Sequence, residues 1–295
     1  MNRFERLANL RNQSLDELIY SMGMSRDEVL AECESSVGPK IPLLQRIADE
    51  FELTFDDLLD GRIDEEWARN PELAPMFKAE EGSRLRTSLA VIRWIENHYG
   101  RQPTVSLTRA LRIPKKALAN PDQPVRLKLL GTLLKATRAR GLSDSVIFEM
   151  GVGATDIPEN AEILATLAKS KNPRQMFEHF FAEILSRFES NYEYRIDKCD
   201  SHSLTLRIRP LEQRILENGR EVATDRSIAI YRWGVAAGLL KTMMPNAAAA
   251  IPIQFAGPHT RDELVRLDWD GRARETVNFP MRKTRVGPHE AEPSA

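Results

Sequence analysis

The sequence has few cysteines and few histidines, and this shortage limits the chemistry that the chain can carry. Cys33 and Cys199 are the two cysteines among 295 residues, and the five histidines are scattered. No CxxC pair and no Cys/His cluster is present, so neither a disulfide framework nor a zinc site is indicated. We therefore expect two reduced thiols, no metal and no cofactor.

Long hydrophobic runs are also lacking. The most apolar stretch begins at Trp233 and is interrupted by Lys241, which leaves it shorter than the roughly 20 apolar residues that span a bilayer. The first residues, MNRFERLANLRNQ, are charged and lack the apolar segment of a signal peptide. These absences predict a cytoplasmic protein without a membrane partner.

Common catalytic motifs are missing as well. The sequence contains no GxGxxG after a strand, no GxxxxGK[ST], no HExxH and no GxSxG. His179 stands beside Phe180 and Phe181, where a packed helix residue is expected rather than a base. Because no nucleophile, base and orienting group can be assembled, we expect no enzymatic activity.

The composition that remains is that of a soluble globular protein, with 42% hydrophobic and 29% charged residues. The net charge of −1 conceals two segments of opposite sign. Residues 1–62 carry seven basic and thirteen acidic residues, a balance of −6, and residues 84–140 carry thirteen basic and two acidic residues, a balance of +11. The basic block could be a solvated face, a contact with the acidic segment in cis or in a dimer, or a site for nucleic acid or an anionic ligand.

Helix starts are clearly marked in the first sixty residues. Ser14-Leu-Asp-Glu17, Ser25-Arg-Asp-Glu28 and Thr54-Phe-Asp-Asp57 fit the capping box, in which a hydroxyl and a carboxylate three residues later cap each other's backbone. Apolar residues recur at every third or fourth position between them. Gly23 can end the second helix with a positive φ. The pattern predicts five short helices that include a helix-turn-helix.

The runs SLDELIYSMGMSRDEVLAEC and PKIPLLQRIADEFELTFDDLLDG resemble the lambda-repressor-like (XRE) helix-turn-helix family over residues 3–61. The resemblance implies binding to double-stranded DNA. Two positions depart from the family, since Cys33 and Ser35 stand where a glutamate and then a glycine are common. Carried over by position, the DNA-binding residues are Gln13, Ser14, Ser25, Arg26, Asp27, Glu28, Ala31 and Lys40.

The acidic character of the third helix leaves two interpretations open. Arg26 is the best candidate for a base contact, because arginine pairs bidentately with guanine, although a solvated arginine balancing its acidic neighbours is the alternative. Carboxylates oppose the phosphate contacts that dominate affinity for DNA. The module could instead bind a protein partner.

After residue 83 the pattern changes from helices alone to helices with a small sheet. It predicts a hairpin over 192–208, which alternates in twos, and close packing of a helix through Gly234 and Gly238. The fold class is therefore α+β. The predicted helices cover residues 84–98, 105–111, 125–140, 159–169, 174–188, 228–244 and 262–267, and the other strands 251–255 and 275–279.

This part of the chain, residues 84–281, resembles the arabinose-binding-like effector domain of AraC-type regulators. The matching runs are ALRIPKKALANPDQPVRLKLLGTLLKATRARGLSD, AIYRWGVAAGLLKTMMPNAAAAIPIQFAGP and VRLDWDGRARETVNFP. The resemblance implies a domain that senses a small molecule and forms a homodimer. Amphipathic or aromatic residues that could line its pocket, or belong to the core, are Arg207, Arg209, Tyr231, Trp233 and Phe279.

The sequence thus predicts a transcriptional regulator that binds an inverted DNA repeat as a homodimer and responds to a small-molecule effector. The alternative is an adaptor whose helix-turn-helix binds a protein. The predicted domains are a helix-turn-helix at 1–63, a linker at 64–83, an α+β effector and dimerisation domain at 84–281, and a disordered tail at 282–295.

Overall fold

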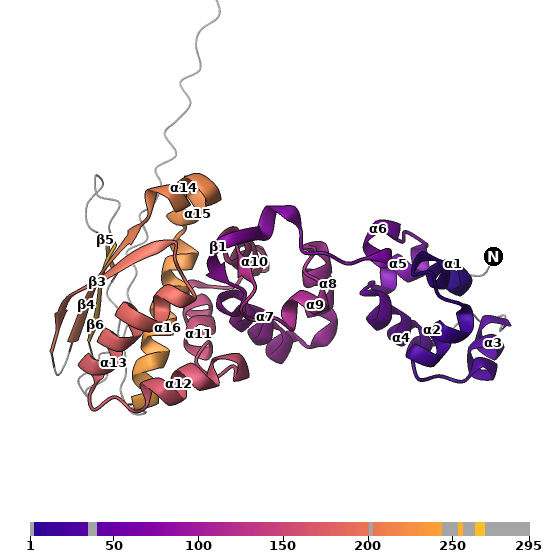
Figure 1. The fold of residues 1–295 in the computed structure, drawn as a ribbon, viewed down its shortest axis with the longest axis horizontal. Helices are drawn as coiled ribbons and strands as arrows, with labels where there is room; N and C mark the ends of the chain where they lie inside the picture. The colour runs from indigo at the N-terminus through magenta and orange to yellow at the C-terminus, as the bar shows by residue number, and fades with distance from the viewer. Residues whose placement is uncertain (1–2, 35–39, 201–202, 244–252, 256–262, 269–295) are drawn as a thin grey trace, which may run out of the picture.

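The computed structural model describes residues 3–34, 40–200, 203–243, 253–255 and 263–268. Helices dominate these residues, and the strands form two antiparallel sheets. The predicted α+β class is confirmed at this level. Figure 1 shows the larger sheet at one end of the molecule, the first six helices at the other, and α7 to α10 between them.

The first helices begin where the capping boxes predicted. Ser14 caps α2 and Thr54 caps α5 in reciprocal hydrogen bonds with Glu17 and Asp57, and Ser25 exchanges the same bonds with Glu28 at the start of α3. Gly23 has a φ of 64° after α2, as predicted. The bounds are α1 (Arg3–Leu10), α2 (Leu15–Ser21), α3 (Arg26–Glu34), α4 (Ile41–Phe51), α5 (Phe55–Asp60) and α6 (Glu65–Arg69).

These six helices bury one group of apolar side chains, called here the amino-terminal cluster. Its members run from Phe4 to Ala68, and Phe51 is completely buried within it. Trp67 on α6 also belongs to it, and its indole Nε1 donates to the Glu52 backbone oxygen at 3.1 Å. The segment 64–83, predicted as a linker, therefore contains the helix α6, and further regular structure follows α6 within it. The predicted domain limits themselves stay a prediction.

A second group of buried side chains, the main cluster, extends from Leu73 to Leu240. Its central element is α16 (Arg226–Met243), which is buried on all sides, as expected for a helix in the middle of a core. The surrounding helices are η1 (Pro75–Phe77), α7 (Arg86–Tyr99), α8 (Arg101–Ala110), α9 (Lys115–Leu118), α10 (Lys128–Ala139), α11 (Asp144–Gly153), η2 (Pro158–Asn160), α12 (Ala161–Leu167), α13 (Pro173–His179), η3 (Phe180–Ile184), η4 (Leu185–Arg187), α14 (Glu212–Asn218) and α15 (Arg220–Ala223).

The larger sheet has the order β3-β4-β6-β5, and each neighbouring pair is antiparallel. Its strands are β3 (Tyr192–Cys199), β4 (Ser203–Pro210), β5 (Ile253–Phe255) and β6 (Glu263–Asp268); β1 (Lys78–Arg84) and β2 (Pro124–Val125) form the smaller sheet. The predicted hairpin is confirmed.

The helix predicted over 262–267 is wrong. These residues form β6, in which Val265 pairs with Leu206 of β4 and with Ile253 of β5. The neighbouring strands β4 and β5 supply backbone hydrogen bonds on both sides of β6. These bonds outweigh the weak helical pattern of so short a segment. The strand predicted at 275–279 and the tail at 282–295 lie outside the described residues.

Helices α11 and α16 approach each other through glycines. A Cβ atom placed on Gly234 would lie 2.1 Å from the backbone oxygen of Phe148, and one on Gly151 would lie 2.1 Å from that of Tyr231. Gly238 makes a similar approach to Val152. The predicted close packing of the helix that contains Gly234 and Gly238 is confirmed. One side of α16 packs against α11, and residues on other sides of α16 line a cavity together with residues of β4 and α12.

Candidate functional site

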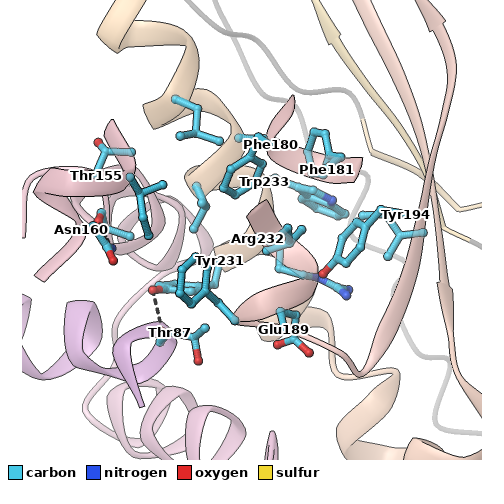
Figure 2. Close-up of a pocket in the computed structure, with 18 of the residues that line it drawn as sticks. Thr87, Thr155, Asn160, Phe180, Phe181, Glu189, Tyr194, Tyr231, Arg232 and Trp233 are labelled. Carbon is cyan, nitrogen blue, oxygen red and sulfur yellow. Dashed lines mark hydrogen bonds between the residues drawn. The ribbon is translucent and has the colours of Figure 1, made fainter. Parts of the chain in front are cut away.

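A cavity of about 120 Å³ lies inside the main cluster, between α16, the inner face of β4 and the turn η3. Its size is similar to that of an apolar cavity of about 150 Å³ that takes up benzene or xenon. Figure 2 shows labelled side chains of α16, η3 and β3 around one space. The cavity is therefore a candidate site for a small ligand.

The wall is mostly apolar and comes from segments far apart in the sequence. Strand β4 supplies every second residue because strand side chains alternate between faces, and η3 supplies two phenylalanines from a single turn of π-helix, a rare form that is common at functional sites. The apolar lining residues include Phe180, Phe181, Leu204, Leu206, Ile208, Ile163, Leu164, Leu130, Ala236 and Leu239.

One end of the cavity is polar. Arg232 reaches it from α16, with its guanidinium carbon 3.8 Å from the centre of the Tyr192 ring. Figure 2 shows Arg232 directed towards Tyr194, and a hydrogen bond joins these two side chains. Glu189 also lines the cavity. An arginine, a glutamate and a tyrosine thus line this end of the cavity.

Glu189 is fixed by a buried hydrogen-bond network. Its carboxylate accepts hydrogen bonds from the Ser83 hydroxyl at 2.8 Å and from the Asn191 backbone N–H at 2.8 Å. The Asn191 side chain in turn accepts from Asn218 Nδ2 at 3.1 Å. Buried polar groups with satisfied partners are rigid, and this network holds the carboxylate in place where β3 begins.

The opposite side of the cavity is tied to α7. The Tyr231 hydroxyl donates to the backbone oxygen of Thr87 at 2.8 Å (Figure 2). Arg86 packs over the Phe188 ring, at 4.5 Å from its centre, and donates to the Glu159 backbone oxygen at 2.9 Å. These contacts join α7 to α16 and to the segments around Glu159 and Phe188.

Burial raises the pKa of both phenols well above the usual range of tyrosine. For Tyr194 the hydrogen bond and the charge of Arg232 act in the opposite direction but do not cancel the effect of burial. Both phenols are therefore neutral hydrogen-bonding groups at physiological pH.

The structure brings together two of the five sequence-predicted ligand residues. Tyr231 and Trp233 both line the cavity. Arg207 instead pairs with Asp197 at 2.8 Å on an exposed part of the sheet, and Arg209 is exposed on the same strand. Phe279 lies outside the described residues.

The sequence interpretation missed Arg232, Tyr194 and Glu189. A signal for Arg232 was present, since an arginine within a helix that is apolar all round must find a partner. Tyr194 was assigned to the hairpin only. Glu189 carried no signal, because its role depends on Ser83, more than a hundred residues earlier in the chain.

The residues predicted to bind DNA lie in α3 or just before α2, α3 and α4, and most of them are exposed. Ser14 and Ser25 form the capping boxes, and Glu28 is the capping partner of Ser25. Arg26 pairs with Asp16, Nη1 to Oδ2 at 3.3 Å. Asp27, Ala31 and Lys40 are exposed and Gln13 is half-buried.

Comparison with known proteins identifies no family for the chain. No protein-family model matches the sequence, and no curated protein is significantly similar to it. Solved structures with similarity include an Fe(II) unliganded H-NOX protein from K. algicida, 11% identical, with a TM-score of 0.48 over 66% of this chain and 99% of that one. An H-NOX protein from S. oneidensis in the Fe(II)NO ligation state is 9% identical, with a TM-score of 0.47 over 63% and 99%.

A mutant of T. Tengcongensis H-NOX is 10% identical, with a TM-score of 0.45 over 63% of this chain and 97% of that one. Identities and scores at this level do not assign a function to the chain. The sequence interpretation is corrected here, because the solved structures named above are H-NOX proteins and not XRE or AraC-type proteins. The predicted membership of those two families is wrong.

The predicted function is wrong as well. The sequence predicted a transcriptional regulator that binds DNA as a homodimer. The similar solved structures are H-NOX proteins and do not support that function or DNA as the partner. The local geometry agrees, because Arg26 is paired with Asp16 and the neighbouring carboxylates oppose phosphate. The adaptor alternative gains no support either.

Proposed function

We propose that this chain binds a small, largely apolar molecule in the cavity between α16, β4 and η3. The observation that supports the proposal is the combination of an apolar wall with a few converging polar groups at one end, which is the general character of ligand sites in proteins. At about 120 Å³ the space suits a ligand the size of a single aromatic ring.

The polar end favours a neutral ligand with one hydrogen-bonding group. Arg232 and Glu189 bring one charge of each sign to the lining, and the Tyr194 and Tyr231 phenols are neutral because burial raises the pKa of each. A charge on the ligand would lose its hydration in a cavity whose wall is mostly apolar. Phenol-like or indole-like molecules therefore fit better than benzoate-like ones.

A haem does not fit this site. A similar structure concerns haem redox potential in its own protein, but the described residues that line the cavity include no histidine, cysteine or methionine, the common axial ligands of haem iron. Tyrosine can also ligate haem iron, yet the raised pKa of Tyr194 and Tyr231 disfavours the phenolate form. The proposal therefore involves no haem.

The proposed activity is binding rather than catalysis. Thr87 and Thr155 bring hydroxyl groups to the cavity, but no histidine or lysine is among the described lining residues to act as their base. In the described part of the chain no group of three or more His, Cys, Asp or Glu residues could hold a metal ion.

No helix among the described residues is long and apolar enough to cross a bilayer. We propose a cytoplasmic location on a different ground, the two widely separated cysteines, which are typical of a reducing compartment.

The test is a binding screen on the full chain with benzene, phenol, indole and benzoate, read by isothermal titration calorimetry and thermal shift. A neutral ring at a hundred times its dissociation constant should stabilise the protein by about 2.7 kcal/mol. Ala236→Leu fills the cavity and should weaken phenol or indole binding at least tenfold. Ala139→Leu, the same substitution at an exposed position of α10, should leave it unchanged. The proposal fails if no ring binds, or if Ala236→Leu binds as the parent protein does.

A further inference from the structure

Basic side chains on α8, on α9 and in the turn between them contact acidic residues of the amino-terminal helices. The Arg109 Nε atom is 2.6 Å from Asp57 Oδ2, and Arg109 Nη1 donates to the Glu52 backbone oxygen at 2.9 Å. Arg101 pairs with Asp49 at 2.9 Å. These three pairings connect residues about fifty positions apart.

The contact continues at the start of α9. The Lys115 backbone N–H donates to Glu52 Oε2 at 2.8 Å, and the Lys115 ammonium is 4.0 Å from Asp49 Oδ1. Arg112 pairs with Asp64. The guanidinium carbons of Arg109 and Arg112 lie 5.6 and 5.5 Å from the Trp67 ring centre, close enough for a cation–π attraction.

The buried apolar cores on the two sides of this contact are separate. The amino-terminal cluster and the main cluster have no described residue in common. A cavity of about 490 Å³ borders this contact. Its described lining comes from α7, α8, α9 and the residue that follows α9, apart from Glu52 of the amino-terminal part. A contact made mainly of ion pairs and hydrogen bonds permits relative motion of the two parts, in contrast to a large hydrophobic one.

The sequence left three interpretations of the basic block open, and the pairings select one. Arg101, Arg109, Arg112 and Lys115 bind acidic groups of the same chain. Arg86 also pairs in cis, with Asp122 of the main part. The contact in cis is therefore what the structure shows for these residues, and the segment charges of −6 and +11 give it a long-range attraction.

We propose that α8 and α9 hold the amino-terminal helices by an electrostatic latch, formed by Arg101, Arg109, Arg112 and Lys115 with Asp49, Glu52, Asp57 and Asp64, that opens when charge is screened. Single exposed ion pairs contribute little, so the latch depends on several acting together. The proposal is independent of the ligand proposed above, because none of these residues lines the 120 Å³ cavity.

Carbodiimide crosslinking tests the latch directly, because the reagent joins amines to carboxylates only when they are in contact. Mass spectrometry should detect Lys115 joined to Asp49 or Glu52. Raising NaCl from about 0.1 to about 1 M shortens the screening length from about 10 to about 3 Å and should lower that yield several-fold. The local pair of Lys78 and Glu72, 2.8 Å apart, is the internal control, because its partners are only six residues apart and cannot separate far.

Charge-reversal variants distinguish the effect of the latch residues from that of the overall charge of the protein. Arg101→Glu with Arg109→Glu should lower the Lys115 crosslink already at low salt, whereas Lys135→Glu, at an exposed position of α10, should not. Adding Asp49→Lys to Arg101→Glu should restore part of the Lys115 to Glu52 crosslink relative to Arg101→Glu alone. Far-UV circular dichroism checks that each variant is folded.

Three results would overturn the proposal. The first is a Lys115 crosslink that salt changes no more than the Lys78 control. The second is a loss in Lys135→Glu equal to that in the double variant. The third comes from mixing ¹⁴N and ¹⁵N protein: if most Lys115 crosslinks join a light chain to a heavy one, the contact is between two copies and the latch in cis is wrong.

Discussion

Gly151 and Gly234 determine how closely α11 and α16 can pack, and so where the cavity wall stands. A methyl group at either position would overlap a backbone oxygen of the other helix at 2.1 Å. Backbone cannot rotate away as a flexible side chain can, so the helices must separate. We therefore expect Gly234→Ala to lower the free energy of unfolding by roughly 1–3 kcal/mol, the usual cost of overpacking, measured by urea denaturation.

Gly153 provides the matched control in α11 itself. A Cβ atom there would meet nothing within 4 Å, so Gly153→Ala should be neutral or stabilise the protein by up to about 1 kcal/mol through helix propensity. If Gly234→Ala were as well tolerated as Gly153→Ala, the close approach of the two helices would be disproved.

At the scale of the element, the capping boxes of the first helices give a second prediction. The Ser14 hydroxyl accepts a hydrogen bond from the Glu17 backbone N–H, and the Ser14 backbone N–H donates one to the Glu17 carboxylate. Ser14→Ala should lower the free energy of unfolding by about 1 kcal/mol. Ser143→Ala at the start of α11 should have a smaller effect, because Ser143 makes no side-chain cap bond. Equal losses in urea titrations would contradict the role of the cap.

The same boxes predict a dependence on pH. Hydrogen bonds from the serine backbone and hydroxyl lower the pKa of Glu17 and of Glu28. A carboxyl whose pKa is lowered in the folded state stabilises the fold above its unfolded pKa, and this contribution is lost as the pH falls through the folded value. Urea midpoints measured from pH 7 to about pH 3 should therefore fall less steeply for Glu17→Gln than for the parent. An identical slope would contradict the prediction.

At the scale of the whole molecule, the two hydrophobic clusters should respond separately to core mutations. Phe51 is completely buried in the amino-terminal cluster and Phe177 in the main cluster. Phe51→Ala should lower the local stability of its cluster by about 3–5 kcal/mol, and hydrogen exchange should accelerate in residues 3–68 and not in α10 or α16. Phe177→Ala should do the reverse. Acceleration throughout the chain in both variants would show a single cooperative unit.

The amount that could be predicted from sequence differs between elements. Capping boxes and the hairpin depend on residues a few positions apart, so their signals are local and were found. The segment 262–267 has both a helical and an alternating pattern, and only its neighbours β4 and β5 made it a strand. In the cavity, Tyr231 and Trp233 were predicted as candidates, but the partners that define its polar end were not.

By itself the sequence determined the helix starts, the hairpin, the close packing at Gly234, and the opposite charges of its first two segments, because each follows from composition or short spacing. Only the tertiary structure decided that Gly151 is the glycine facing Gly234, that Glu189 and Arg232 share one cavity, and that Arg109 meets Asp57. The physical reason is that each of these pairs is separated by forty or more residues, and the packing of whole helices and strands brings them together.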